Sequence, residues 1–406
     1  MRILVIHQQF LRRGAPGGSR FNDLSRQWRS AGHDVDVVAS SVHYASGSGA
    51  EARWPWSRDE QDGARVTRTW ALSHTSGRFA RRAGSMVAYA GLGTLAASLQ
   101  RSRPDVVIAS SPTLAAFLPG LVAASRWRCR LVLEVRDLWP ESVVALGGID
   151  PGGLAARVAY GFEEGAYEQA DLVVALTPGI RDRLVKRRVV PSDRCVVIPN
   201  GVDLGAIPRV ERGSMREQLG FTDRFVAVYA GAHGVANGLE QLIDAACLLR
   251  DHPEVLLLAI GDGPQRERLR RETEKRGLQN LRWLPAMARD ELFRHLVAAD
   301  AGIVSLHDTP TFQTVYPNKM FDYMAASIPV VLGVEGVAAE LIRNADAGVC
   351  FPPQQPHALA YALLELHADP NRAHHLGRNG RHCVESHYDR HQQAQTYLDL
   401  IAKLHP

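Results

Sequence analysis

Short runs of apolar, β-branched residues alternate with helical or polar stretches along the chain, and this alternation constrains the fold more than any other feature. Strands that alternate with helices predict mostly parallel, doubly wound sheets of the α/β class. Because 406 residues exceed one typical hydrophobic core, we expect two such domains. The predicted strands are 3–6, 34–39, 65–70, 105–109, 131–135 and 172–175 in the first half, and 225–230, 255–260, 281–284, 302–305 and 330–332 in the second.

The stretch 315–331, VYPNKMFDYMAASIPVV, has the pattern of a loop, a short helix and a buried strand. Asn318 is a good N-cap residue, and the free N–H groups and dipole at a helix start favour a phosphate. Lys319 adds a full positive charge there, and Asp322, one turn later, can accept hydrogen bonds from ribose hydroxyls. The alternative is an ordinary surface helix in which Lys319 and Asp322 form an i,i+3 ion pair.

A glycine-rich loop, GAPGGSR at 14–20, follows the first predicted strand and precedes a helix. The paired glycines Gly17 and Gly18 let backbone N–H groups approach an oxyanion closely, and Arg20 can bind a phosphate or carboxylate with its fork of donors. The spacing is not the G-x-G-x-x-G of dinucleotide-binding proteins, which counts against an NAD enzyme.

A polar cluster, EVRDLWPES at 134–142, stands at the end of another predicted buried strand. Ionisable groups at such a strand end are costly to bury unless they are paired or used. Arg136, Asp137 and Glu141 are therefore candidate catalytic residues. The alternative is a structural ion network of Arg136 with Asp137 or Glu141.

These motifs together resemble one known family. The pattern P-[SN]-K-x-x-[DE]-Y-M-A-x-x-x-P-V-V from residue 317, D-L-W-P-E-S from 137 and I-P-N-G-V-D from 198 resemble family 4 retaining glycosyltransferases, which have the GT-B fold. Within that family the sequence is most similar to bacterial enzymes of O-antigen and colanic-acid assembly, such as N-acetylfucosamine transferases.

The resemblance implies two Rossmann-like domains that face a central cleft. By this resemblance the first, acceptor-binding domain spans 1–203 and is joined by a C-terminal helix at 388–406, and the nucleotide-sugar-binding domain spans 204–387. Family members have Arg and Lys in a loop that here begins at Gly231, where Ala232 and Asn237 stand instead.

The charge for the leaving diphosphate must then come from His233, backbone N–H groups or Lys319. Pro285 and Met287 occupy positions whose backbone holds the base in the family. The resemblance thus implies that nucleotide-sugar binding involves Gly17, Gly18, Arg20, Gly231, Asn237, Pro285, Met287, Asn318, Lys319 and Asp322, with Arg136, Asp137, Glu141 and His233 as the catalytic set. A glutamate eight residues before Asp322 in the family is Thr314 here.

The expected activity is retaining transfer of a sugar from a nucleotide-diphospho-sugar to an acceptor hydroxyl, without metal or cofactor. The donor is expected to be UDP-linked, with an N-acetylated deoxysugar as one candidate, and the acceptor a lipid-linked glycan. The alternatives are a nucleotide-sugar epimerase on the same fold, transfer to a small natural-product acceptor, and a binding protein that has lost the chemistry.

Composition is consistent with a cytoplasmic protein. Five cysteines lack disulfide spacing, and neither a signal peptide nor a long apolar stretch is visible. Residues 1–200 carry 26 Lys and Arg against 18 Asp and Glu, although the whole chain has a net charge of only +4. No feature indicates nucleic acid. Arg78, Arg81 and Arg82 precede an apolar helical stretch at 86–99, so peripheral contact with the inner face of a membrane is a further hypothesis, against a helix that only packs on the sheet.

Overall fold

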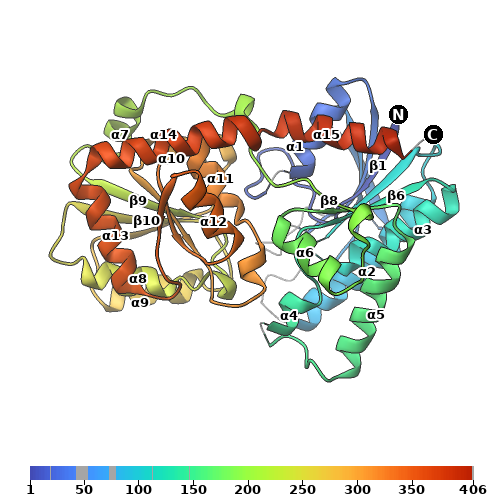
Figure 1. Ribbon diagram of the computed structural model, residues 1–406, viewed down its shortest axis with the longest axis horizontal. Helices are drawn as coiled ribbons and strands as arrows, with labels where there is room; N and C mark the ends of the chain where they lie inside the picture. Colours follow the sequence, from blue (N-terminus) through green and yellow to red (C-terminus); the bar gives the residue numbers. More distant parts are fainter. Residues whose placement is uncertain (19, 43–53, 73–78, 112, 146, 405–406) are drawn as a thin grey trace. The chain divides into compact units, whose positions relative to one another are not determined.

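The computed structural model describes residues 1–18, 20–42, 54–72, 79–111, 113–145 and 147–404 (Figure 1). The chain divides into two compact units. The first unit contains Met1–Arg13, Ser19–Pro199 and His391–Pro406, and the second contains Gly14–Gly18 and Asn200–Arg390. The chain crosses between them after Pro199 and after Arg390, a few residues from the predicted limits at 203 and 387.

The first unit is built on an eight-stranded sheet in the order β3-β4-β2-β1-β5-β6-β7-β8. All neighbours are parallel except β3 and β4. Because β1 lies between β2 and β5, the direction of winding reverses at β1 and β5, which is where ligands bind in sheets of this class. The strands are β1 (Arg2–Ile6), β2 (Asp34–Ser40), β3 (Trp56–Gln61), β4 (Ala64–Thr69), β5 (Val106–Ser110), β6 (Arg130–Val135), β7 (Leu172–Ala175) and β8 (Cys195–Val197).

Seven helices of the described residues accompany this sheet, and all of them except α4 contain buried apolar side chains. They are α1 (Arg20–Ser30), α2 (Phe79–Ser98), α3 (Phe117–Trp127), α4 (Glu141–Ala145), α5 (Leu154–Gln169), α6 (Pro178–Lys186) and the C-terminal α15 (Arg390–Lys403), with short 3-10 turns η1 (Leu114–Ala116) and η2 (Ser192–Arg194). α15 shares a hydrophobic core with β1 and α1 through Tyr397 and Ile401. The indole N–H of Trp28 donates to the carbonyl of Ala394 at 3.1 Å, which ties α1 to α15.

The second unit has a six-stranded, wholly parallel sheet in the order β11-β10-β9-β12-β13-β14. Its strands are β9 (Phe225–Ala230), β10 (Val255–Ile260), β11 (Leu281–Leu284), β12 (Ala301–Ser305), β13 (Val330–Gly333) and β14 (Gly348–Cys350). Most are buried along their whole length, as expected for parallel strands covered on both faces. The winding reverses between β9 and β12, so the carboxyl ends of these two strands mark the expected ligand site.

Helices cover both faces of the second sheet, with a separate hydrophobic core on each. They are α7 (Arg212–Leu219), α8 (Glu240–Leu248), α9 (Arg266–Lys275), α10 (Arg289–Ala298), α11 (Asn318–Ala325), α12 (Val337–Asn344), α13 (Pro356–Ala368) and α14 (Pro370–His387), with turns η3 (Leu204–Ala206), η4 (Val235–Asn237) and η5 (Phe312–Thr314). The predicted α/β class with doubly wound, mostly parallel sheets is therefore confirmed. Among the described residues, no helix is both long and apolar enough to cross a bilayer.

Candidate functional site

The loops that follow β9 and β10 are hydrogen-bonded to each other at the carboxyl edge of the second sheet. The backbone N–H of Gly231 donates to the carbonyl of Ile260 at 2.9 Å, and that of His233 donates to the carbonyl of Asp262 at 2.8 Å. Gly261 permits this approach, because a Cβ there would lie 1.8 Å from the Gly231 carbonyl oxygen. The loop of residues 231–237 is therefore held rigidly beside the strand ends.

Lys319 reaches this loop from the first turn of α11. Its ammonium nitrogen lies 3.8 Å from the ring centroid of Tyr229 and 3.3 Å from Oδ1 of Asn237. A Cβ on Gly231 would lie 3.1 Å from the same nitrogen, so glycine leaves the room that the lysine occupies. The structure thus brings the predicted residues Gly231, Asn237 and Lys319 together.

The ammonium group of Lys319 is held in a partly buried position, where carrying a positive charge costs free energy. Burial lowers the pKa of Lys319 to about 7, and no carboxylate is among the causes of that shift. A ring face and an amide oxygen solvate a cation less well than water does. Such a lysine can gain free energy when an anion arrives, which fits a site that binds phosphate.

The helix start beside Lys319 differs by one residue from the prediction. α11 begins at Asn318, and Pro317 occupies the N-cap position, so the predicted N-cap role of Asn318 is wrong. The Oδ1 atom of Asn318 instead accepts a hydrogen bond from Asn200, which fixes that side chain away from its own helix N–H groups. The positive end of the helix dipole still lies next to the lysine.

Asp322 lies one turn further along α11 and has a protein partner. Its Oδ1 accepts from Nη2 of Arg289 at 2.9 Å, and both side chains are partly buried. This pair replaces the alternative Lys319–Asp322 ion pair considered above. Contact of Asp322 with a ribose stays a prediction.

The segment after β11 lines a cavity of about 440 Å³ within the second unit. Pro285 and Met287 are among its lining residues, as the prediction of a base-binding segment requires. The glycine-rich segment of residues 14–18 also belongs to this unit, and Gly14 and Pro16 line the cavity while Gly17 and Gly18 do not. Contact of Gly17 and Gly18 with a nucleotide sugar therefore stays a prediction.

The structure contradicts the predicted role of His233. Its side chain is 0% exposed, and its ring meets Trp283 edge-on at a centroid distance of 5.2 Å. Burial, together with the charges of Arg266 and Lys319, lowers the pKa of His233 to about 4, so the ring is neutral at pH 7. A neutral, enclosed ring cannot supply the positive charge that was predicted to neutralise the leaving diphosphate, so the structure does not support His233 in the catalytic set.

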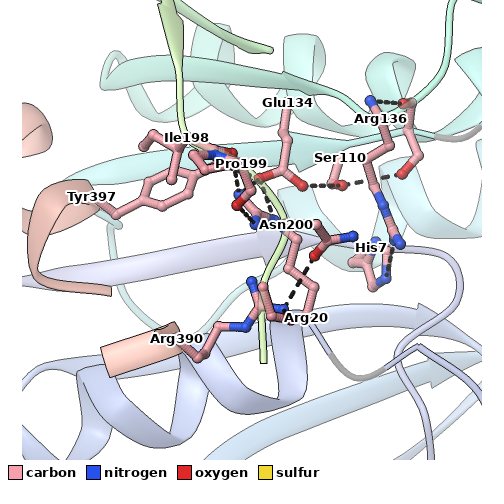
Figure 2. A network of polar contacts seen from close by, with 12 residues as sticks. His7, Arg20, Ser110, Glu134, Arg136, Ile198, Pro199, Asn200, Arg390 and Tyr397 are labelled. Atoms are coloured by element: carbon pink, nitrogen blue, oxygen red, sulfur yellow. Dashed lines mark hydrogen bonds and ion pairs between the residues drawn. The ribbon is translucent and has the colours of Figure 1, made fainter. Parts of the chain in front are cut away.

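In the first unit, Arg136 and Asp137 follow β6 beside the reversal point of the sheet. The backbone N–H of Arg136 donates to Oγ of Ser111, and its Nη1 lies 3.4 Å from Nε2 of His7, which follows β1 (Figure 2). Burial raises the pKa of Asp137 against the opposing effect of Arg136, while burial and then Arg136 lower the pKa of His7 well below its ordinary value. His7 was missed because nothing in its local sequence marks it.

Glu141 makes its ion pairs with residues other than Arg136, Asp137 and His7. It begins α4 and pairs with Arg183 at 3.0 Å and with Arg187 at 3.9 Å. The predicted alternative of an Arg136–Glu141 pair is not the arrangement found. Because two arginines, one in α6 and one just after it, neutralise the carboxylate, an ion network explains Glu141 better than catalysis does.

The structure contradicts the predicted role of Arg20 as a phosphate ligand. Its guanidinium is 2% exposed and donates to Glu134, to the carbonyl of Ile198 at 3.0 Å and to that of Pro199 at 2.6 Å (Figure 2). The opposing charge of Glu134 offsets the cost of burying it and leaves the pKa of Arg20 raised. Arg20 is therefore a structural cation rather than a phosphate ligand.

The two doubly wound, mostly parallel sheets define a protein with two Rossmann-like domains. In the described residues, no group of three or more His, Cys, Asp or Glu side chains is arranged to hold a metal ion. A Glycosyl transferase 4-like domain matches residues 17–201, and Glycosyl transferases group 1 matches residues 211–383. The chain belongs to the family 4 glycosyltransferases, and its fold is GT-B.

Relatives along nearly the whole chain support this assignment. WcaI of Escherichia coli, assigned as a glycosyl transferase of colanic acid biosynthesis, is 25% identical over 84% of this chain and 86% of its own. A glycogen synthase of Mycobacterium tuberculosis is 26% identical over 96% and 91%. Among solved structures, sucrose-phosphate synthase of Thermosynechococcus elongatus has a TM-score of 0.77 at 19% identity, covering 99% of this chain and 98% of its own. Anabaena HepE with UDP-glucose has a TM-score of 0.73 at 19% identity, covering 99% and 100%.

Proposed function

We propose that this glycosyltransferase moves a sugar from a UDP-linked donor to an acceptor hydroxyl, with retention of the anomeric configuration and without a metal or cofactor. The observation that carries the donor assignment is the partly buried lysine cluster of Lys319, Asn237 and Gly231 beside the β9–β12 reversal point. Anabaena HepE was crystallised in complex with UDP-glucose, which supports uridine as the base.

In the proposed reaction, the bond from the anomeric carbon to the β-phosphate oxygen breaks and the acceptor oxygen bonds to the same face of that carbon. The acceptor proton passes to the leaving diphosphate, so no separate protein base is required. Lys319 and the start of α11 stabilise the charge that develops on the diphosphate. Arg136 and Asp137 are proposed to contact the transferred sugar or the acceptor.

The proposed acceptor is a lipid-linked glycan, and an N-acetylated deoxysugar is the donor sugar to test first. The assignment of WcaI to colanic acid biosynthesis supports a surface polysaccharide. A kanosaminyltransferase of Streptomyces kanamyceticus, 24% identical over 53% of this chain, supports a small-molecule acceptor as the second candidate.

The test combines binding with turnover. A thermal-shift screen of nucleoside diphosphates and their sugars should give its largest shift with uridine compounds, because ligands of the native state stabilise it. Incubation of the best donor with lipid-linked and soluble acceptors should release UDP only when an acceptor is present. Conversion of the donor sugar without an acceptor would instead identify an epimerase, and nucleotide binding without any turnover would favour a binding protein.

UDP binding should depend on pH through Lys319. In the free protein its ammonium is largely charged below pH 7 and neutral above it, while a bound diphosphate would raise its pKa. Affinity should therefore fall as pH rises above about 7, by up to about tenfold per unit, until the pKa of the complex is reached. Calorimetry from pH 7 to 9 in buffers of different ionisation enthalpy would measure the accompanying proton uptake.

The Lys319→Arg variant is the control for this pH dependence, because arginine stays charged throughout the range. Its affinity should change little between pH 7 and pH 9. The same decline in both proteins would show that another group is responsible.

Membrane contact through α2 is part of the proposal for a lipid-linked acceptor. Val87 and Leu95 on this helix are exposed and eight residues apart, so they lie on the same broad face, and Leu99 just beyond the helix is exposed as well. Exposed Arg101 and Arg103 follow. Arg78 lies outside the described residues, as do the side chains of Arg81 and Arg82.

The protein should sediment with anionic vesicles at low salt and be released as salt screens the attraction over about 8 Å at physiological ionic strength. The double variant Val87→Glu, Leu95→Glu should stay in the supernatant. Tyr361→Glu, at an exposed position of α13 in the second unit, should behave like the parent. No sedimentation with anionic vesicles even at low salt would exclude this contact and favour a soluble acceptor.

A further inference from the structure

The chain segments next to the crossings after Pro199 and after Arg390 are joined to each other in the second unit. Val202 follows the first crossing, and Tyr388–Arg390 precede the second. The backbone N–H of Val202 donates to the carbonyl of Tyr388 at 3.1 Å, and that of Arg390 donates to the carbonyl of Val202 at 3.0 Å. These bonds form a parallel bridge between Val202 and Asp389. The two crossing segments therefore form a short paired ribbon.

Asn200, the first residue after the crossing, connects this ribbon to the donor site. It is 4% exposed, and its Oδ1 accepts from Nη2 of Arg390 at 3.1 Å (Figure 2). Arg390, itself 3% exposed, also donates to the carbonyl of Gly201 at 2.5 Å. The other end of the Asn200 amide donates to Oδ1 of Asn318, the first residue of α11.

The orientation of the Asn200 amide is fixed by its partners. An arginine side chain has only donors, so the oxygen of the amide must face Arg390 and its NH₂ group must face Asn318. Only a side chain with an acceptor and a donor on one planar group satisfies both partners at once. Asparagine is thus matched to this position, and neither alanine nor aspartate can replace both contacts.

Aromatic rings hold the same two elements together a few residues away. Tyr388 packs against Phe321 of α11 at a centroid distance of 4.8 Å, and Tyr316, which precedes α11, contacts both rings at 6.4 and 5.9 Å. The start of α11 is therefore attached to the crossing segments both by the amide hydrogen bond and by packed aromatic rings. Lys319 lies next to the amide hydrogen bond.

On the other side of the crossing, the chain is anchored in the first unit. Arg20 binds the carbonyls of Ile198 and Pro199 and pairs with Glu134, which also accepts from Ser110 and from Tyr397 of α15 (Figure 2). Side-chain hydrogen bonds thus hold the chain on both sides of the crossing, at Ile198 and Pro199 in the first unit and at Asn200, whose amide is bonded to the first residue of α11, in the second.

We propose that Asn200 is a positioning residue for the donor diphosphate, because it couples the interunit crossing to the start of α11 through Asn318. This inference rests on the proposed donor site. In this proposal Asn200 does not contact the substrate, and it affects donor binding through Asn318. A change in backbone conformation at the crossing would then change the position of α11 and Lys319 relative to the diphosphate.

The test is a double-mutant cycle on the full chain with UDP as the probe. Asn200→Ala and Asn318→Ala should each weaken UDP binding by about three- to tenfold, the effect of losing the neutral hydrogen bond that joins the two amides. The double variant should show no further loss, because both changes break the same connection. Asn379→Ala, at a residue of α14 that bonds to Asp346 away from the site, is the matched control.

A purely structural role predicts a different result, in which Asn200→Ala lowers the melting temperature but leaves the UDP dissociation constant within twofold of the parent. That result, or additive losses in the double variant, would overturn the inference. Because Asn318 is exposed, its variant should fold even if Asn200→Ala does not, and an unchanged affinity in Asn318→Ala would also overturn the inference. A parent that binds no nucleoside diphosphate would refute the proposed donor site and this inference with it.

Discussion

Replacing Lys319 by alanine is expected to weaken UDP binding by about 1.5–3 kcal/mol, or roughly 10- to 150-fold. Lys319 is the cation that the structure holds beside Asn237 and the start of α11, with its nitrogen over the Tyr229 ring. Its charge is poorly solvated in the free protein, so a diphosphate would form charge-assisted hydrogen bonds with little competition from water. Isothermal titration at pH 6.5, where the lysine is charged, measures the loss.

A matched control separates this local effect from a general loss of positive charge. Lys275 is exposed at the end of α9 in the same unit, and Lys275→Ala should bind UDP like the parent. Lys319→Ala should also fold normally, since removing a charge whose burial is already costly takes little from the native state. If Lys319→Ala binds UDP as tightly as Lys275→Ala does, the diphosphate site lies elsewhere.

Much of the fold could be predicted from local sequence because parallel strands are buried on both faces. Continuous apolar runs such as those of β9 and β10 leave few other structures available. β3 was missed for the opposite reason: it is a polar, antiparallel edge strand with the sequence WSRDEQ. β14 and α14 were also missed, the first because three residues give almost no pattern and the second because its sequence is rich in His, Arg and Gly.

The candidate site was predictable where a motif carries its own local geometry. Lys319 follows a helix start, and a helix start beside parallel strand ends attracts anions whatever surrounds it. Arg20, Glu141 and His233 were misjudged because their partners are distant in sequence. Arg20 and Glu134 are 114 residues apart, and no local pattern shows that the pair is buried. The burial of His233 depends likewise on a loop that follows a different strand.

The burial of Arg20 leads to the prediction with the largest expected effect on stability. Arg20→Met should lower the free energy of unfolding of the first unit by about 3–5 kcal/mol at pH 7, because it leaves the Glu134 carboxylate buried without its cation. Urea titration followed by tryptophan fluorescence is suitable, since six of the seven tryptophans lie in the first unit. The double variant Arg20→Met, Glu134→Gln should recover part of the loss, because the uncompensated charge is gone.

The pair of Arg65 and Asp36 on the same sheet is the control, since the Arg65 side chain is 52% exposed whereas that of Arg20 is 1% exposed. Arg65→Met should cost only about 0–1 kcal/mol, because water already solvates the Arg65 charge and can reach the Asp36 carboxylate once the arginine is gone. A loss as small as that of Arg65→Met, together with weaker UDP binding, would show that Arg20 serves the ligand as the sequence first suggested. Unchanged UDP affinity in a destabilised protein would establish its structural role.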